Sequence, residues 1–102
     1  MYIIVWEFKA KAGCEAAFEQ AYGPQGAWVN LFEKGEGFLG TELLQDTAEP
    51  GWYITIDRWA TQAAFEEFRR RWAGDYEAVD ARCAAWTENE TALGSFATVD
   101  PG

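Results

Sequence analysis

A chain of 102 residues is long enough for one domain with a single hydrophobic core. Seventeen acidic against eight basic residues give a net charge of -9, and such a surface repels nucleic-acid phosphates and anionic lipid headgroups, so we expect neither nucleic acid nor a membrane as a partner. Six Trp, seven Phe and four Tyr supply more large aromatic area than a core of this size needs, which predicts a second buried surface at a subunit interface or around a ligand.

The first expected element is a strand over residues 2–9, YIIVWEFK, which is rich in β-branched and aromatic residues and ends at the turn sequence AKAG. Its alternate side chains form two apolar sets, so we expect both faces of this strand to be covered. Residues 14–22 carry apolar positions at helical spacing and predict an amphipathic helix that GPQG ends. A second short helix is expected around Trp28 and Phe32, before Gly35 and Gly37 end it.

Two further strands are predicted over residues 38–45 and 52–59, joined by the hairpin connection DTAEPG. On the second of these strands, one face carries Trp52, Ile54, Ile56 and Arg58, and the other carries Tyr53, Thr55, Asp57 and Trp59. The latter face mixes aromatic and polar side chains, which favours the lining of a cavity over a dry core.

Thr61 is expected to cap a helix whose apolar positions include Phe65, Phe68 and Trp72, while the run of three arginines over residues 69–71 is interpreted as a solvent-exposed face. After Gly74, helical spacing of apolar residues predicts a further helix. The chain is predicted to close with a strand over residues 93–99, and residues 96–102 are expected to fray in part.

This order of elements is that of an α+β, ferredoxin-like split βαβ domain, with a four-stranded antiparallel sheet and helices on one face. We expect one such domain over residues 1–102. The other face of the sheet would be bare, and a monomer would expose Ile54 and Ile56 there. A twofold homodimer that packs sheet on sheet is therefore predicted.

The sequence predicts neither a metal site nor a bound cofactor. It contains no His, no carboxylate pair at ligand spacing beyond what 17 acidic residues give by chance, and no nucleotide-binding glycine motif. Cys14 and Cys83 lie far apart, and since no secretory signal precedes them we expect free thiols in a cytoplasmic protein. Without a His as base partner, both cysteines are interpreted as small buried hydrophobic residues.

Three stretches of the chain, YIIVWEFKAKAG, GFLGTELLQD and YITIDRWATQAAFEEF, resemble the antibiotic biosynthesis monooxygenase (ABM) family of dimeric α+β barrel proteins over nearly the whole length. The most specific part is the strand ending in Arg58-Trp59, followed by a polar turn and an Ala-Phe helix. The resemblance implies a dimer with a pocket between helices and sheet in each subunit. In some relatives that pocket oxidises electron-rich aromatic substrates, such as anthrones or quinols, with molecular oxygen and without metal or flavin; other relatives degrade haem.

The resemblance transfers to single residues only in part. Trp59 stands where both kinds of relative place a pocket Trp. Thr55 stands where anthrone-oxidising relatives carry an Asn, Phe65 where they carry a Tyr, and Trp6 where haem-degrading relatives carry an Asn. Because the chain has no His, histidine-ligated haem chemistry is excluded.

Oxygenation without a cofactor needs a dry pocket, a base or hydrogen-bond donor, and a group that stabilises negative charge. The candidate catalytic residues are Asp57, Tyr53 and Arg82. The candidate substrate-binding residues, whose aromatic members would stack a planar ring, are Trp59, Thr55, Trp6, Phe65 and Trp72.

Each candidate has a plain alternative. Trp59 at a strand–helix junction could be core packing, Asp57 could pair with a partner on another strand or subunit, and Arg82 could lie in solvent or at an interface. Three functions therefore stay open: a cofactor-independent monooxygenase, a small-ligand-binding protein of the same fold, and a structural dimer without a specific ligand.

Overall fold

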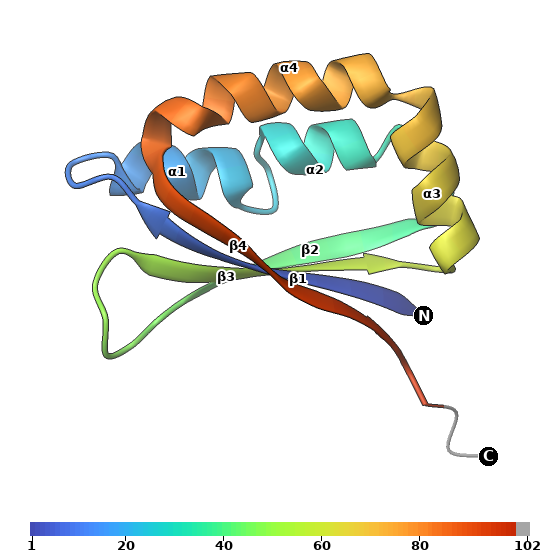
Figure 1. The fold of residues 1–102 in the computed structure, drawn as a ribbon, viewed down its shortest axis with the longest axis horizontal. Helices are drawn as coiled ribbons and strands as arrows, with labels where there is room; N and C mark the ends of the chain where they lie inside the picture. Colours follow the sequence, from blue (N-terminus) through green and yellow to red (C-terminus); the bar gives the residue numbers. More distant parts are fainter. Residues whose placement is uncertain (100–102) are drawn as a thin grey trace.

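The computed structural model describes residues 1–99 as a four-stranded antiparallel sheet with helices on one face (Figure 1). Its elements in chain order are β1 (Tyr2–Ala10), α1 (Glu15–Tyr22), α2 (Ala27–Phe32), β2 (Phe38–Gln45), β3 (Trp52–Trp59), α3 (Gln62–Arg71), α4 (Ala73–Cys83), the single 3-10 turn η1 (Ala84–Trp86) and β4 (Thr87–Ala97). The strand order β2-β3-β1-β4 is that of the ferredoxin-like split βαβ fold, which confirms the expected fold class. None of the helices in the described part is long and apolar enough to cross a membrane.

Local side-chain chemistry sets several boundaries of these elements. The Thr61 hydroxyl accepts a hydrogen bond from the Ala64 amide at 3.0 Å, which is the expected helix cap. In the β2–β3 hairpin, the Asp46 carboxylate accepts hydrogen bonds from the amides of Ala48 and Glu49 at 2.8 and 3.0 Å, and these bonds lower the pKa of Asp46. Gly51 closes the hairpin with a φ of 85°.

The last strand begins earlier than the sequence pattern indicates. β4 covers Thr87–Ala97 instead of residues 93–99, and it pairs along the whole of β1 with two register shifts. Within the tail of residues 96–102 that is expected to fray in part, Phe96 and Ala97 pair with Ile3 and Tyr2; residues 100–102 lie outside the described part. A central strand with a free edge offers a full ladder of hydrogen bonds, and this offsets the weak strand propensity of the polar run TENET.

The core lies between the sheet and the helices and is mainly aromatic. Trp59 is fully buried, and its ring centroid lies 5.6 Å from that of Phe65 and 5.0 Å from that of Phe68, so the expected burial of Trp59 against the start of the next helix is confirmed. Phe32 and Phe38 complete its surroundings. Both cysteines are free, as expected; Cys83 is buried and Cys14 is half-buried.

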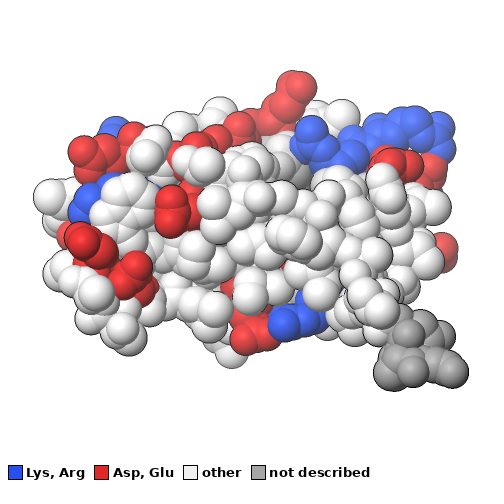
Figure 2. Space-filling model, turned by 60° about the horizontal axis from the view of Figure 1, so that its bottom comes forward, with Lys and Arg blue, Asp and Glu red and all other residues white. Residues whose placement is uncertain are grey.

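The opposite face of the sheet is uncovered in the single chain. It carries Ile3, Val5, Ile54 and Ile56 at half-buried positions, because the register sets these alternate residues of β1 and β3 side by side. Figure 2 shows a broad surface without charged atoms over the sheet, with charges gathered around its edges. The apolar open face that the strand pattern predicts is therefore present.

One glycine marks where the connection between α2 and β2 approaches the core closely. A Cβ atom on Gly35 would lie 2.9 Å from the Phe68 ring and 3.0 Å from the Trp59 ring. On Gly74, inside α4, a Cβ would meet nothing within 4 Å. Gly35→Ala should therefore destabilise the protein by about 1–3 kcal/mol through overpacking, whereas Gly74→Ala should stabilise it by about 0.5–1 kcal/mol through helix propensity. Urea denaturation of both variants measures these changes, and equal effects would contradict the close packing at Gly35.

Candidate functional site

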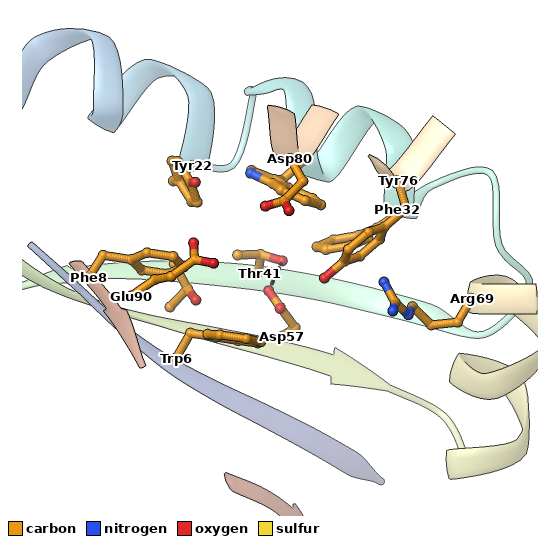
Figure 3. Close-up of a pocket in the computed structure, with 12 residues that line it drawn as sticks. Trp6, Phe8, Tyr22, Phe32, Thr41, Asp57, Arg69, Tyr76, Asp80 and Glu90 are labelled. Atoms are coloured by element: carbon orange, nitrogen blue, oxygen red, sulfur yellow. Dashed lines mark hydrogen bonds between the residues drawn. The ribbon is translucent and has the colours of Figure 1, made fainter. Parts of the chain in front are cut away.

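A cavity of about 270 Å³ lies between the sheet and the helices (Figure 3). Its floor comes from the helix-facing side chains of the sheet, and its roof comes from α1, α2 and α4. The lining residues are Trp6, Phe8, Tyr22, Trp28, Phe32, Thr41, Thr55, Asp57, Arg69, Tyr76, Asp80 and Glu90. A second lobe of about 360 Å³ shares Asp57, Arg69 and Tyr76 with the first and continues toward Tyr2 and Phe65. Half of the twelve residues that line the first lobe are aromatic, which suits a ligand with a planar ring, and the other half are polar or charged.

Asp57 lies at the centre of this floor. It is on β3, where alternation turns its side chain toward the helices, and it is only 7% exposed. The antiparallel register places Thr41 of β2 directly opposite, and the Thr41 hydroxyl donates a hydrogen bond of 2.7 Å to Asp57 Oδ1. Burial raises the pKa of Asp57 to about 6, although the Thr41 hydrogen bond acts in the opposite direction.

No positive charge neutralises Asp57. The ion pairs among the described residues join Lys34 to Asp75, Arg58 to Glu42 and Arg70 to Glu67. Arg58, its neighbour along the strand, points to the open face instead. The cross-strand partner considered for Asp57 is thus a neutral hydroxyl, and Asp57 Oδ2 makes no hydrogen bond within residues 1–99.

Arg69 supplies the positive charge nearest to this region of the cavity. Its guanidinium lies over the Tyr76 ring, 3.8 Å from the ring centroid, and both residues line both lobes. The interpretation of the three arginines as a solvent face therefore holds only in part, since Arg69 is largely exposed but also reaches the cavity. The signal was available in the sequence, because Arg69 follows Phe65 by four residues and shares its face of α3.

Three of the expected site residues meet at the cavity: Trp6, Thr55 and Asp57. Phe65 lines the second lobe only. Trp59 lines neither lobe; it lies in the core, and its indole N–H has no hydrogen-bond partner in the described part of the chain.

The remaining candidates lie away from the cavity. The buried Tyr53 donates a hydrogen bond of 2.5 Å to Glu19 Oε2, and burial together with Glu19 raises the pKa of Tyr53 to about 12. Arg82 is exposed and faces a separate groove between α1, α2 and α4, because Tyr76 and Asp80 occupy the cavity side of α4. Trp72 packs at the α3–α4 junction beneath the Lys34 ammonium group, 5.1 Å from its ring centroid.

Sequence reasoning missed several residues that the cavity uses, mainly Thr41, Tyr22, Trp28, Tyr76, Asp80 and Glu90. The aromatic members had been assigned to helix core stripes, which is correct for their spacing but does not tell core from cavity wall. The acidic members stand among many other acids of an acidic chain. Within the described residues, no group of His, Cys, Asp or Glu side chains could hold a metal ion.

The fold occurs in several solved structures of low sequence identity. SnoaB from Streptomyces nogalater, described as a cofactor-independent oxygenase, is 18% identical with a TM-score of 0.71, over 97% of this chain and 93% of that one. PA3566 from Pseudomonas aeruginosa is 17% identical with a TM-score of 0.69 (97% and 94%), and a NIPSNAP domain protein from Burkholderia xenovorans is 15% identical with a TM-score of 0.73 (100% and 98%). No curated protein matches the chain. The family model for antibiotic biosynthesis monooxygenases matches residues 1–73, so the chain belongs to the antibiotic biosynthesis monooxygenase family.

Proposed function

We propose that this protein is a cofactor-independent monooxygenase that oxidises a small electron-rich aromatic compound, of the quinol or anthrone type, with molecular oxygen. The observation that carries the proposal is Asp57: a buried carboxylate with one free oxygen atom, directed into an aromatic cavity and left without a counter-charge. Family membership and the oxygenase description of SnoaB support the same reaction class. Such a group in a cleft is characteristic of a general base.

In the proposed reaction, Asp57 Oδ2 removes a proton from a phenolic hydroxyl or an activated ring CH₂ of the substrate. The resulting anion transfers an electron to oxygen, the two radicals combine, and the peroxide loses water to leave a carbonyl group. One oxygen atom enters the product and the other leaves as water, so the substrate supplies all four electrons. The Arg69 guanidinium can stabilise the negative charge that develops, and the aromatic side chains of the wall can hold the substrate ring.

The pKa of Asp57 suits this role. At about 6 it leaves the carboxylate mostly ionised at neutral pH, yet more basic than an exposed Asp. Thr41 would orient the carboxylate and hold Oδ1, leaving Oδ2 for the substrate. Tyr53 and Arg82 have no part in this scheme.

A ligand-binding protein without chemistry is the alternative. It is favoured by Thr55 and Phe65, which stand in place of the polar residues that the anthrone-oxidising relatives carry. Oxygen consumption separates the two functions. A binding protein would be stabilised against thermal unfolding by its ligand but would not consume oxygen.

Asp57→Asn should lower oxygen consumption with a panel of reduced quinols and anthrones by about 10²–10⁴-fold, because it removes the base but keeps the shape. Thr41→Val should instead move the acidic limb of the kcat/KM profile to higher pH, since it removes the hydrogen bond that lowers the pKa of Asp57. An oxygen electrode with metal-stripped protein measures both. Glu77→Gln, on the exposed side of α4, is the control; wild-type uptake equal to the protein-free rate across the panel would overturn the proposal.

An ionised carboxylate at a buried position should also cost stability. Because the folded pKa of Asp57 is above its unfolded value of 3.8, the unfolded chain ionises first, and stability falls between about pH 4 and pH 6. Above that window the loss amounts to at most about 3 kcal/mol for a shift to about 6. Asp57→Asn should therefore leave the free energy of unfolding nearly unchanged at pH 4 and raise it by about 1–3 kcal/mol at pH 8. Chemical denaturation at the two pH values tests this; a pH-independent difference would contradict it.

We further propose that two copies pair through the open face of the sheet to form a homodimer. Phe96 and Leu44 are 53% and 43% exposed, and they extend the apolar surface of Ile54 and Ile56. Sheet-on-sheet packing would bury this surface and needs no change in the cavity, which lies on the other side of the sheet.

Light scattering at micromolar concentration should give twice the mass of the chain for the wild type. Ile56→Lys, which places a charge at the centre of the open face, should give the monomer mass, because an unpaired buried charge opposes association. Glu77→Lys on the outer side of α4 should remain dimeric. A monomeric wild type would refute the homodimer.

A further inference from the structure

The charges around the cavity are separated. Figure 3 shows Arg69 entering from α3 at one end, Glu90 from β4 beside Phe8 toward the other end, and Asp80 from α4 in the roof between Tyr22 and Tyr76. Neither carboxylate forms an ion pair within residues 1–99. Partial burial raises the pKa of Glu90, and the charge of Asp80 raises it further, so the two acids lie close enough to repel each other. A positive charge between them would relieve this repulsion.

The same end of the cavity has aromatic walls. The centroids of the Phe8 and Tyr22 rings are 4.7 Å apart, those of Trp6 and Phe8 are 6.1 Å apart, and those of Tyr22 and Trp28 are 6.1 Å apart. These rings are in contact with one another and line the cavity together, and aromatic rings attract ammonium groups through cation–π interaction. No Lys or Arg of the described chain occupies this end, since Arg69 is the one basic residue in the cavity lining.

The floor of the cavity carries polar atoms that have no hydrogen-bond partner among the described residues. Thr55 is 4% exposed, lines the cavity, and its hydroxyl makes no hydrogen bond within the described residues. Asp57 leaves Oδ2 free. The described chain thus leaves both oxygen atoms available to a ligand in the cavity.

The overall charge favours the same kind of ligand. The lining contains three carboxylates against one guanidinium, and the chain carries a net charge of -9. A low-dielectric cleft lined mainly by one sign of charge concentrates ligands of the opposite sign.

We propose that the space between Asp80 and Glu90 is a binding site for a protonated amine or quaternary ammonium group, carried by the aromatic substrate of this cavity. The substrate class is thus a basic, ammonium-bearing aromatic compound whose ring lies along Trp6, with its acidic position at Asp57. That the ligand is a substrate rests on the proposed function, whereas the ammonium site requires only that the ligand binds.

The test compares three phenols that differ in one substituent: 3-hydroxyphenyltrimethylammonium, its neutral isostere 3-tert-butylphenol, and 3-hydroxybenzenesulfonate. Titration into the protein, by calorimetry or by quenching of tryptophan fluorescence, gives the three dissociation constants. The cation should bind about tenfold more tightly than the neutral isostere, and the sulfonate should bind most weakly.

Matched variants distinguish binding at Asp80 and Glu90 from an effect of the overall negative charge of the protein. Asp80→Asn/Glu90→Gln should abolish the preference for the cation while binding of 3-tert-butylphenol stays unchanged. Glu77→Gln/Glu88→Gln removes the same charge from the same two elements but outside the cavity lining, and it should keep the preference. Equal affinities for the cation and its isostere, or the same loss of preference in both double variants, would overturn the proposal.

The outcome of the ligand-binding test is independent of the oxygen-consumption test of the proposed function. Selective cation binding without oxygen consumption would support the ammonium site and count against the monooxygenase. Oxygen consumption with neutral quinols and no preference for the cation would do the reverse.

Discussion

The site depends on the alternation of side chains along β3. This strand turns Tyr53, Thr55, Asp57 and Trp59 toward the helices, and all four are buried. The outer two are aromatic and pack into the core, whereas the inner two are polar. A helix layer cannot close directly over a carboxylate and a hydroxyl without unpaired polar groups, so an apolar core in this place would be costly. The cavity is the space that this arrangement leaves.

Two aromatic clusters hold the cavity open. On one side Trp59 packs among Phe32, Phe38, Phe65 and Phe68, which surround it completely. On the other side Phe18 lies between Phe8, Tyr22 and Tyr53, with centroid separations of 4.2 to 5.5 Å. Close-packed rings have few alternative arrangements, so the walls should keep their positions without a ligand. Their packing also offsets the cost of the buried Asp57 carboxylate, which is how a protein can maintain a destabilising buried group.

The charged side chains make the two ends of the cavity electrostatically different. Arg69 on Tyr76 lies at the α3 end, Asp57 and Asp80 lie in the middle on the floor and the roof, and Glu90 lies toward the other end. A ligand with an acidic position and a basic substituent would fit in one orientation only, because reversal would place like charges together. Orientation of the reacting position against Asp57 would then follow from the same charges that select the ligand.

Residue order alone determined the element types, the α+β order, the Thr61 cap and the mixed face of β3, because all of these follow from periods of 2 and 3.6 residues and from local hydrogen bonds. Together with the family resemblance, it named Trp6, Thr55 and Asp57 as site candidates, and the structure brings these three to one cavity. Only the tertiary structure decided that Thr41 is the partner of Asp57, that Arg69 reaches the cavity while Arg82 does not, and that Trp59 is core while Tyr22 and Tyr76 are wall. It likewise decided the length of β4. These features depend on strand register and on the rotation of each helix about its axis, and both are set by contacts between residues far apart in the chain.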